Sequence, residues 1–327
     1  MARVLFLGGT GQISRPCVTE AVRAGHEVVV FTRGQRGELV PDGVEAVIGD
    51  MRVDADMRAL GRRSFDVVCQ FQAFTTEQVT RDLDALAGRM GQYVFLSSAS
   101  VYQKPPRHHV ITEETPAANP YSLYAQQKIA CEALLHERTD LNWTIVRPSH
   151  TPRTNLPTMM NEGDVVGRRM LAGKPVIVSG DGTTPWTITR AADFAVPFVR
   201  LFGNSGARGE TFHITSDHAF TWNEIYTALG AALGVTPEIV HVPTDVIVRY
   251  HKPWERHLRG DKSYTALFDN SKVKRVAGDF ACAATLEEII REPVSHFNRR
   301  MSEGEGAPSE LDALTDRIVA DISALGL

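Results

Sequence analysis

The first half of the chain alternates short apolar runs with segments whose apolar residues recur at helical spacing. Continuous apolar runs are typical of strands that are buried on both faces of a parallel sheet, and the helical segments between them supply the connections. The pattern predicts strands at Arg3–Leu7, His26–Phe31, Val44–Ile48, Asp66–Phe71, Gln92–Leu96 and Trp143–Val146.

The connecting segments carry recognisable signals for helix ends. A helix from about Gln12 to Ala24 is expected to end at Gly25, because glycine readily adopts the left-handed conformation of a helix C-terminus. Thr75-Thr76 is a plausible N-cap for the next helix, and another is expected from Tyr121 to Glu137. Strands and helices therefore alternate up to about residue 150.

Beyond residue 150 the pattern becomes looser. Thr221 and Glu224 have the spacing of a capping box, which predicts a helix over Phe220–Leu233. The segment Thr244–Lys272 mixes aromatic and positively charged residues without clear periodicity. The tail has one apolar helical face, expected to dock on the body or on another subunit, formed by Leu311, Leu314, Ile318, Ile322 and Leu325.

These patterns predict an α/β protein with a Rossmann-type doubly wound parallel sheet and a smaller C-terminal α/β substrate domain. We expect the dinucleotide-binding domain at residues 1–150, with a returning segment near 175–215, and the substrate domain at 151–300. Residues 301–327 are expected to form a linker, at Ser302–Ser309, and a C-terminal helix.

Composition narrows the class of protein. The chain has 327 residues and a formal net charge of -4, which argues against a dedicated nucleic-acid surface. The cysteines (Cys17, Cys69, Cys131 and Cys282) lack the spacing of a zinc site, so no metal is expected. No apolar run reaches the ~20 residues of a membrane helix, and no signal peptide is evident. We therefore expect a cytoplasmic protein.

A glycine-rich turn, Gly8-Gly9-Thr10-Gly11, follows the first strand and opens a helix. Glycines there let the backbone approach a pyrophosphate, which rests on the partly positive helix N-terminus. Ser14 replaces the final glycine of the motif and is small enough to keep the close packing. The residues expected to bind a dinucleotide are Gly8, Thr10, Gly11, Gln12 and Ile13 at the turn, with Asp50, Met51, Gln70, Phe71 and Gln72 past the third and fourth strands.

The end of the second strand bears on which dinucleotide binds. It reads Phe31-Thr32-Arg33-Gly34, without the carboxylate that would bind the adenosine ribose of NAD. Arg33, with Arg36 nearby, can instead pair with a 2′-phosphate. We therefore expect NADP, with NAD as the alternative.

Candidate chemistry lies at Tyr124 and Lys128, four residues apart on one helical face. A phenol titrates near pH ~10, and a nearby ammonium favours the phenolate, which brings the hydroxyl closer to useful acid–base chemistry. Ser98 follows the fifth strand, at the sheet edge where ligands bind in open α/β proteins.

Together these residues resemble the extended short-chain dehydrogenase/reductase family, especially its nucleotide-sugar epimerase/dehydratase branch. The resemblance covers about residues 3 to 297. Its supporting motifs are Ser97-Ser98-x-x-Val101-Tyr102, Pro120-x-x-x-Tyr124-x-x-x-Lys128, Arg147-Pro148, and Gly180-Asp181-Gly182 before Ala191-Ala192-Asp193-Phe194-Ala195.

The resemblance implies a role for each matching residue. Tyr124 would take a proton from a sugar hydroxyl while hydride passes to the nicotinamide. Lys128 would hold the nicotinamide ribose and lower the pKa of Tyr124, so both residues would also contact the cofactor. Ser98 would hydrogen-bond the reacting oxygen. The residues expected to contact substrate are Ser100, His150, Arg259 and Lys262.

Two departures from the family pattern restrict the expected function. Dehydratases of the family carry an Asp-Glu pair after the Ser98 position, whereas this chain has Ala99-Ser100, so dehydration by that route is not expected. Many members carry an Asn-x-x-Gly stretch near the dimer-forming helices. This chain has Thr75-Thr76-Glu77-Gln78 there instead, so a homodimer is possible but the usual mode of dimerisation is in doubt.

The leading hypothesis, by a narrow margin, is an NAD(P)-dependent epimerase that acts on a nucleotide-activated sugar through a transient keto intermediate. One alternative is an NADPH-dependent ketoreductase of a nucleotide sugar or a secondary metabolite. Another is a non-catalytic relative that binds RNA or serves as a scaffold, although Ser98, Tyr124 and Lys128 are all present.

Overall fold

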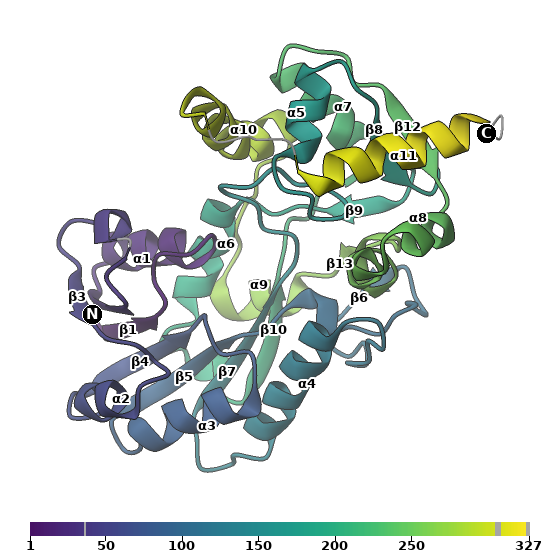
Figure 1. Cartoon of the computed structure of the whole chain (residues 1–327). Coiled ribbons are helices and arrows are strands. Elements are labelled where there is room, and N and C mark those ends of the chain that lie inside the picture. Colours follow the sequence, from purple (N-terminus) through teal and green to yellow (C-terminus); the bar gives the residue numbers. More distant parts are fainter. Residues whose placement is uncertain (36, 305–308, 325–327) are drawn as a thin grey trace.

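A seven-stranded parallel sheet forms the centre of the molecule, a computed structural model in which residues 1–35, 37–304 and 309–324 are described (Figure 1). Its strands run in the order β10-β7-β5-β4-β1-β2-β3. Their bounds are β1 (Arg3–Leu7), β2 (Glu27–Thr32), β3 (Glu45–Ile48), β4 (Phe65–Gln70), β5 (Met90–Leu96), β7 (Trp143–Pro148) and β10 (Glu210–Ile214). The predicted strands are thus all present, and the predicted fold class is confirmed.

Helices cover both faces of this sheet, because its strands present apolar side chains to both sides. On β1, Val4 and Phe6 belong to one buried cluster, whereas Leu5 and Leu7 belong to the cluster on the opposite face. The first cluster includes residues of α1 (Ser14–Arg23), α6 (Ala191–Arg200) and α9 (Ser271–Ala277). The second includes residues of α2 (Asp54–Leu60), α3 (Thr76–Ala85) and α4 (Leu123–His136).

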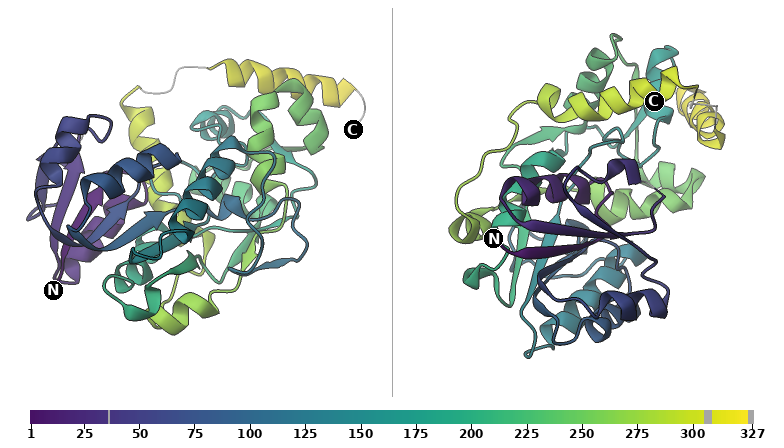
Figure 2. Two further views of the ribbon diagram at one scale, coloured as in Figure 1. Left: turned by 90° about the horizontal axis from the view of Figure 1, so that it is seen from below. Right: turned by 90° about the vertical axis from the view of Figure 1, so that its left-hand side faces the viewer.

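The remaining elements form a smaller C-terminal α/β region with its own core (Figure 2). Its helices are α5 (Val165–Leu171), α7 (Trp222–Ala232), α8 (Thr244–Tyr250) and α10 (Leu286–Ser302). Its strands pair as β8 (Val176–Ser179) with β12 (Ile239–Val242) and β9 (Pro185–Thr187) with β11 (Ala219–Thr221). Near it, β13 (Leu267–Phe268) pairs with β6 (Val110–Ile111). The division into domains stays a prediction.

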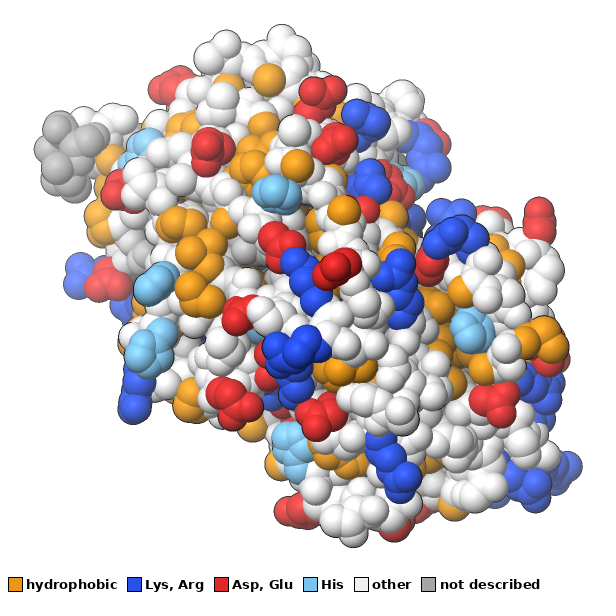
Figure 3. All heavy atoms as spheres, turned by 180° about the vertical axis from the view of Figure 1, so that it is seen from behind, with side chains coloured by type: hydrophobic (Ala, Val, Ile, Leu, Met, Phe, Trp, Pro, Cys, Tyr) orange, Lys and Arg blue, Asp and Glu red, His pale blue; other side chains and the backbone are white. Residues whose placement is uncertain are grey.

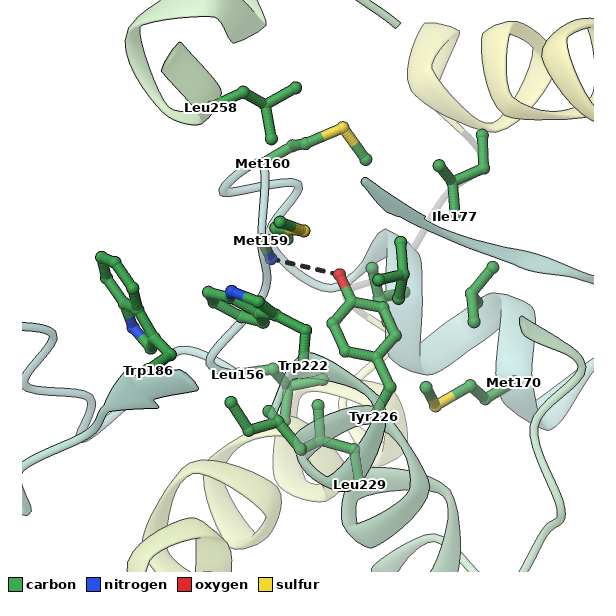
Figure 4. Packing of buried hydrophobic residues seen from close by; sticks show 14 of the residues in the cluster. Leu156, Met159, Met160, Met170, Ile177, Trp186, Trp222, Tyr226, Leu229 and Leu258 are labelled. Carbon is green, nitrogen blue, oxygen red and sulfur yellow. Dashed lines mark hydrogen bonds between the residues drawn. The ribbon is translucent and has the colours of Figure 1, made fainter. Parts of the chain in front are cut away.

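The core of this region packs aromatic side chains among aliphatic residues and methionines (Figure 4). Trp222 and Tyr226 of α7 are fully buried, and the Tyr226 hydroxyl accepts a hydrogen bond from the Met159 backbone at 3.1 Å. Trp186 of β9 packs on Trp222 with 5.5 Å between ring centroids. The predicted capping box at Thr221 and Glu224 is present and begins α7.

The last helix, α11 (Glu310–Ala324), packs on α5, α8 and β8 of the same chain. Ile318 and Ile322 are buried there, and Asp312 pairs with Arg168 at 2.9 Å. The apolar face predicted for the tail therefore docks on the body, although its last member, Leu325, lies outside the described residues.

The linker predicted at Ser302–Ser309 falls partly outside the described residues, because 305–308 are not among them. Within the part of the chain that is described, no helix has the length and apolar character needed to cross a membrane.

Candidate active site

The glycine-rich turn closes tightly against its surroundings at the end of β1. Gly8 has a φ of +90°, and a Cβ there would lie 2.3 Å from the Cγ of Gln72. A Cβ on Gly9 would lie 2.7 Å from the Val30 side chain. Both positions therefore require glycine. Ser14, in place of the family's last glycine, accepts a hydrogen bond from the Gly11 N–H at 2.8 Å and so fastens the turn to α1.

A cleft of about 430 Å³ opens beside this turn, at the carboxyl ends of the parallel strands. Its volume falls within the range of small-molecule and cofactor sites, and the glycine turn allows close backbone approach. The residues around the cleft therefore fit a dinucleotide. The expected cofactor residues that line it are Gly8, Thr10, Gly11, Arg33, Asp50, Met51, Gln70 and Gln72.

Five other expected cofactor residues do not line the cleft: Tyr124 and Lys128, described below, and Gln12, Ile13 and Phe71. The Phe71 ring packs in the core, 5.9 Å from the ring centroid of Phe6. Ile13 packs against the same core. The side-chain oxygen of Gln12 instead accepts a hydrogen bond from the Thr154 backbone at 2.7 Å. Gln12 thus connects the glycine turn to the chain that follows β7.

At the far end of the cleft, Arg52 forms an ion pair with a carboxylate, whereas Arg33 does not form one among the described residues. Asp50 forms a salt bridge with Arg52 at 2.6 Å, and hydrogen bonds from Arg52 lower the pKa of Asp50 to about 2. Arg33 lines the same end of the cleft and, among the described residues, makes no hydrogen bond or ion pair. Its guanidinium therefore remains available for an anion. Arg36 lies outside the described residues.

Behind the cleft, a buried carboxylate holds the loop that follows β4. Asp82 of α3 accepts hydrogen bonds from the Gln70 side-chain amide and from the Tyr93 hydroxyl, the latter at 3.0 Å. Gln70 in turn accepts a hydrogen bond from the Ala73 N–H at 2.9 Å. Burial raises the pKa of Asp82 to about 7.

The raised pKa of Asp82 predicts a pH-dependent contribution to stability. Because the folded-state pKa lies above the usual carboxyl value, this group destabilises the fold as pH rises from about 4 to about 7. We expect Asp82→Asn to remove this pH-dependent decrease in the free energy of unfolding. The decrease is at most about 4 kcal/mol, at ~1.4 kcal/mol per pKa unit. Urea unfolding at pH 5 and pH 8 measures it, and Asp84→Asn, on the exposed face of α3, is the control. Equal pH slopes in wild type and Asp82→Asn would contradict the assignment.

The three candidate catalytic residues lie close together at the carboxyl end of β5. The Ser98 hydroxyl lies near the Tyr124 hydroxyl and 2.9 Å from that of Ser100. The Tyr124 ring centroid is 6.0 Å from that of Phe74, which lines the cofactor cleft. Lys128 lies one turn further along α4, with Nζ 6.0 Å from the Tyr124 ring centroid.

Lys128 is almost fully buried and its ammonium is held by the backbone. Nζ donates hydrogen bonds to the carbonyl oxygens of Ala73 and Leu96, each at 2.7 Å. Burial lowers the pKa of Lys128 to about 8. Its position therefore depends on the loop after β4, the same loop that Asp82 and Gln70 hold.

The electrostatics of Tyr124 differ from the expectation. Burial raises the pKa of the phenol, and the nearby Ser98 hydroxyl opposes the rise. The expected lowering by Lys128 is wrong for the free chain, because the ammonium is directed to two backbone carbonyls and desolvation dominates at the phenol. Tyr124 is thus a neutral proton donor here.

A second, smaller pocket of about 110 Å³ begins at Ser98 and extends toward the C-terminal region. His150 lies in its wall, where its Nδ1 accepts a hydrogen bond from the Trp186 indole at 3.1 Å. Burial lowers the pKa of His150, so the ring is neutral. The expected substrate residues that line the pocket are Ser100, His150 and Lys262.

Arg259 does not line this pocket. Its guanidinium pairs with Asp245 at 2.6 Å and with Glu255 at 2.7 Å. Both carboxylates lie within the segment that had no clear sequence periodicity, so nothing in the sequence paired them with Arg259. The pocket lining instead includes Lys104 and Asp261, which no sequence motif marks.

The profile of the NAD dependent epimerase/dehydratase family matches residues 4–215. The 2'-dehydrokanamycin reductase of Streptomyces kanamyceticus is 30% identical over 253 residues, which cover 74% of this chain and 70% of the reductase. The chloroplast stem-loop binding protein of 41 kDa b of Arabidopsis thaliana is 29% identical over 256 residues, which cover 73% of this chain and 65% of that protein.

Solved structures show the same fold at lower sequence identity. A UDP-glucose 4-epimerase superposes with a TM-score of 0.73 at 18% identity, covering 94% of this chain and 100% of the epimerase. The UDP-glucuronic acid 4-epimerase of Bacillus cereus, solved with NAD, gives 0.72 at 17% identity, covering 93% and 99% of the two chains. Because the family profile spans more than half of the sequence, this chain belongs to the NAD dependent epimerase/dehydratase family, within the extended short-chain dehydrogenases/reductases.

Proposed function

We propose that the protein is an NADP(H)-dependent oxidoreductase that interconverts a secondary alcohol and a ketone on a sugar ring, working as a reductase. The observation that carries this proposal is the position of Tyr124. Its ring lies beside Phe74 of the cofactor cleft, and its hydroxyl lies near that of Ser98, which lines the second pocket. A group at this junction can exchange a proton with a substrate whose carbon faces the cofactor.

The nicotinamide of the cofactor supplies the hydride when bound. In the direction of reduction, the hydroxyls of Ser98 and Tyr124 hold the ketone oxygen, and Tyr124 transfers its proton to that oxygen. The raised pKa keeps Tyr124 protonated at neutral pH, as a proton donor requires. Lys128 lies one turn further along α4, and its proposed role is to hold the nicotinamide ribose.

Two observations support reduction over epimerisation, the reverse of the narrow order expected from the sequence alone. The unpaired Arg33 favours NADP, and a reductase must bind NADPH afresh in each turnover. The relative from Streptomyces kanamyceticus is also a reductase by name. An epimerase acting on a nucleotide sugar is the second candidate, supported by the description of the family.

RNA binding is a weaker proposal, although one relative is named a stem-loop binding protein. The net charge is -4, and acidic and basic side chains are interspersed over the face in Figure 3. A surface for nucleic acid would instead gather positive charge. Affinity for an RNA stem-loop that falls steeply with added salt would support binding.

A cofactor and product assay separates these functions. We expect the purified protein to oxidise added NADPH with a keto-sugar or a related ketone. Tightly bound oxidised cofactor, released on denaturation, together with isomerisation of a nucleotide sugar and no net redox change, would establish the epimerase instead. Failure to bind either NADPH or NADH would exclude both.

We expect Arg33→Ala to weaken NADPH binding about ten- to a hundredfold and to leave NADH binding nearly unchanged. The reason is the loss of a charge-assisted pair with the 2′-phosphate, worth about 1.5–3 kcal/mol. Titration of NADPH and NADH fluorescence measures both affinities. Arg58→Ala, at an exposed position of α2, serves as the control. An equal loss for both cofactors would contradict the role in 2′-phosphate recognition.

A further inference from the structure

A buried lysine of the second pocket has no direct ionic contact among the described residues, although Asp261 and Glu162 act on it at longer range. Lys262 ends a π-helical turn, Leu258–Lys262, and is only 7% exposed. Among the described residues its ammonium makes no hydrogen bond and no ion pair within 4.0 Å. A buried charge without a partner is costly, so its place in a pocket wall points to a ligand of opposite charge.

A second lysine reinforces the positive character of this pocket. The side chain of Lys104 is 2% exposed, and its ammonium lies 3.9 Å from the Asp261 carboxylate, beyond hydrogen-bond distance. Burial lowers the pKa of both lysines and raises that of Asp261, and the attraction between Asp261 and the lysines opposes these shifts. Nearby, Glu162 already accepts the Met160 N–H at 2.9 Å.

The histidines around Lys262 do not add charge of either sign. Burial lowers the pKa of His150 and lowers that of His257 to about 3, so both rings are neutral at physiological pH. The pocket wall therefore contains two lysines and one carboxylate, so positively charged side chains outnumber negatively charged ones there.

The lysines lie beside the reacting centre. One side-chain amide, that of Asn119, donates to the carbonyls of Ser100 and Gly260, each at 2.7 Å. It thereby ties the Ser98–Ser100 loop to the turn that carries Lys262. Trp222 adds a hydrogen bond to the Lys262 carbonyl at 3.2 Å. Because Ser98 and Lys262 share a pocket of about 110 Å³, a group bound by Lys262 belongs to the reacting ring itself.

We propose that Lys262, assisted by Lys104, binds an anionic group carried by the sugar ring that is oxidised or reduced. The inference rests on the proposed function, because it takes Ser98 and Tyr124 as the reacting end of the pocket. A carboxylate and a phosphate share the required charge and acceptor oxygens. A neutral hydroxymethyl group would make no ionic contact with the Lys262 ammonium.

Tryptophan fluorescence can test the proposal, because Trp186 lines the pocket and packs against Trp222. NADP⁺-saturated protein is titrated with D-glucuronate, D-glucose 6-phosphate and D-glucose at constant ionic strength. We expect at least one acid to bind at least tenfold more tightly than glucose. Preference for glucuronate identifies a carboxylate site, and preference for the 6-phosphate identifies a phosphate site.

Variants assign the preference to the lysine. Lys262→Met should abolish it, Lys262→Arg should keep most of it, and Lys252→Met, at an exposed position, should leave it unchanged. Equal binding of all three sugars, no binding of any, or an unchanged preference in Lys262→Met would overturn the proposal. NADPH titration of the same proteins tests the proposed function separately, since the cofactor cleft does not include Lys262.

Discussion

Tyr124→Phe is expected to lower turnover by ~10²–10⁴-fold while leaving the fold and the affinity for NADPH nearly unchanged. The substitution removes the hydroxyl that lies near Ser98 and keeps the ring that packs beside Phe74. General acid–base catalysis by a positioned side chain contributes about this much to rate. Steady-state kinetics on whichever ketone or sugar is turned over gives the rate, and NADPH fluorescence gives the affinity.

The matched control for this variant is Tyr121→Phe, which removes a phenolic hydroxyl just before α4. The Tyr121 hydroxyl makes no hydrogen bond among the described residues, so turnover should stay near the wild-type value. Retention of full activity by Tyr124→Phe would show that the proton comes from another group, and the assignment of Tyr124 would be wrong.

The sheet was predictable because its signal is local. Each strand is a short apolar run, and each crossover begins or ends at residues with strong conformational preferences, such as Gly25 and Thr75. The glycine turn was predictable for the same reason, since its positive φ at Gly8 limits the residue type. The edge strand β10 was foreseen only as part of a returning segment, because five residues in a loosely patterned region carry little signal.

The substrate side was harder to predict, because its chemistry depends on contacts between distant segments. Arg259 and Lys262 are both positively charged residues of one turn, so the sequence alone does not distinguish their roles. The structure pairs Arg259 with two carboxylates and leaves Lys262 in the pocket wall. Lys104 comes from a proline-rich loop far away in the chain, and Asp82 looks like an ordinary polar residue of α3 until Gln70 and Tyr93 enclose it.

The position of Lys128 could be predicted from the sequence, but its electrostatic state could not. Its spacing from Tyr124 marks a helical face, but its electrostatic state follows from the carbonyls of Ala73 and Leu96, on two other segments. We expect Lys128→Met to lower turnover by roughly 10²-fold or more and to weaken cofactor binding. It removes the ammonium that holds the loop after β4 against β5 and that would bind the cofactor, and misplacement of reacting groups by ~1 Å already costs about 10²-fold.

The pH dependence of cofactor binding distinguishes a charge effect of Lys128 from a packing effect. With a pKa of about 8, the ammonium is present below that pH and is lost as pH rises through it. Wild-type affinity for NADPH should therefore fall above pH 8, whereas Lys128→Met should bind weakly at every pH. Gln127→Met, the neighbouring position of α4, should behave as wild type. A wild-type affinity that is flat from pH 7 to pH 9.5 would mean that the ammonium does not hold the cofactor, so that Lys128 acts through packing alone.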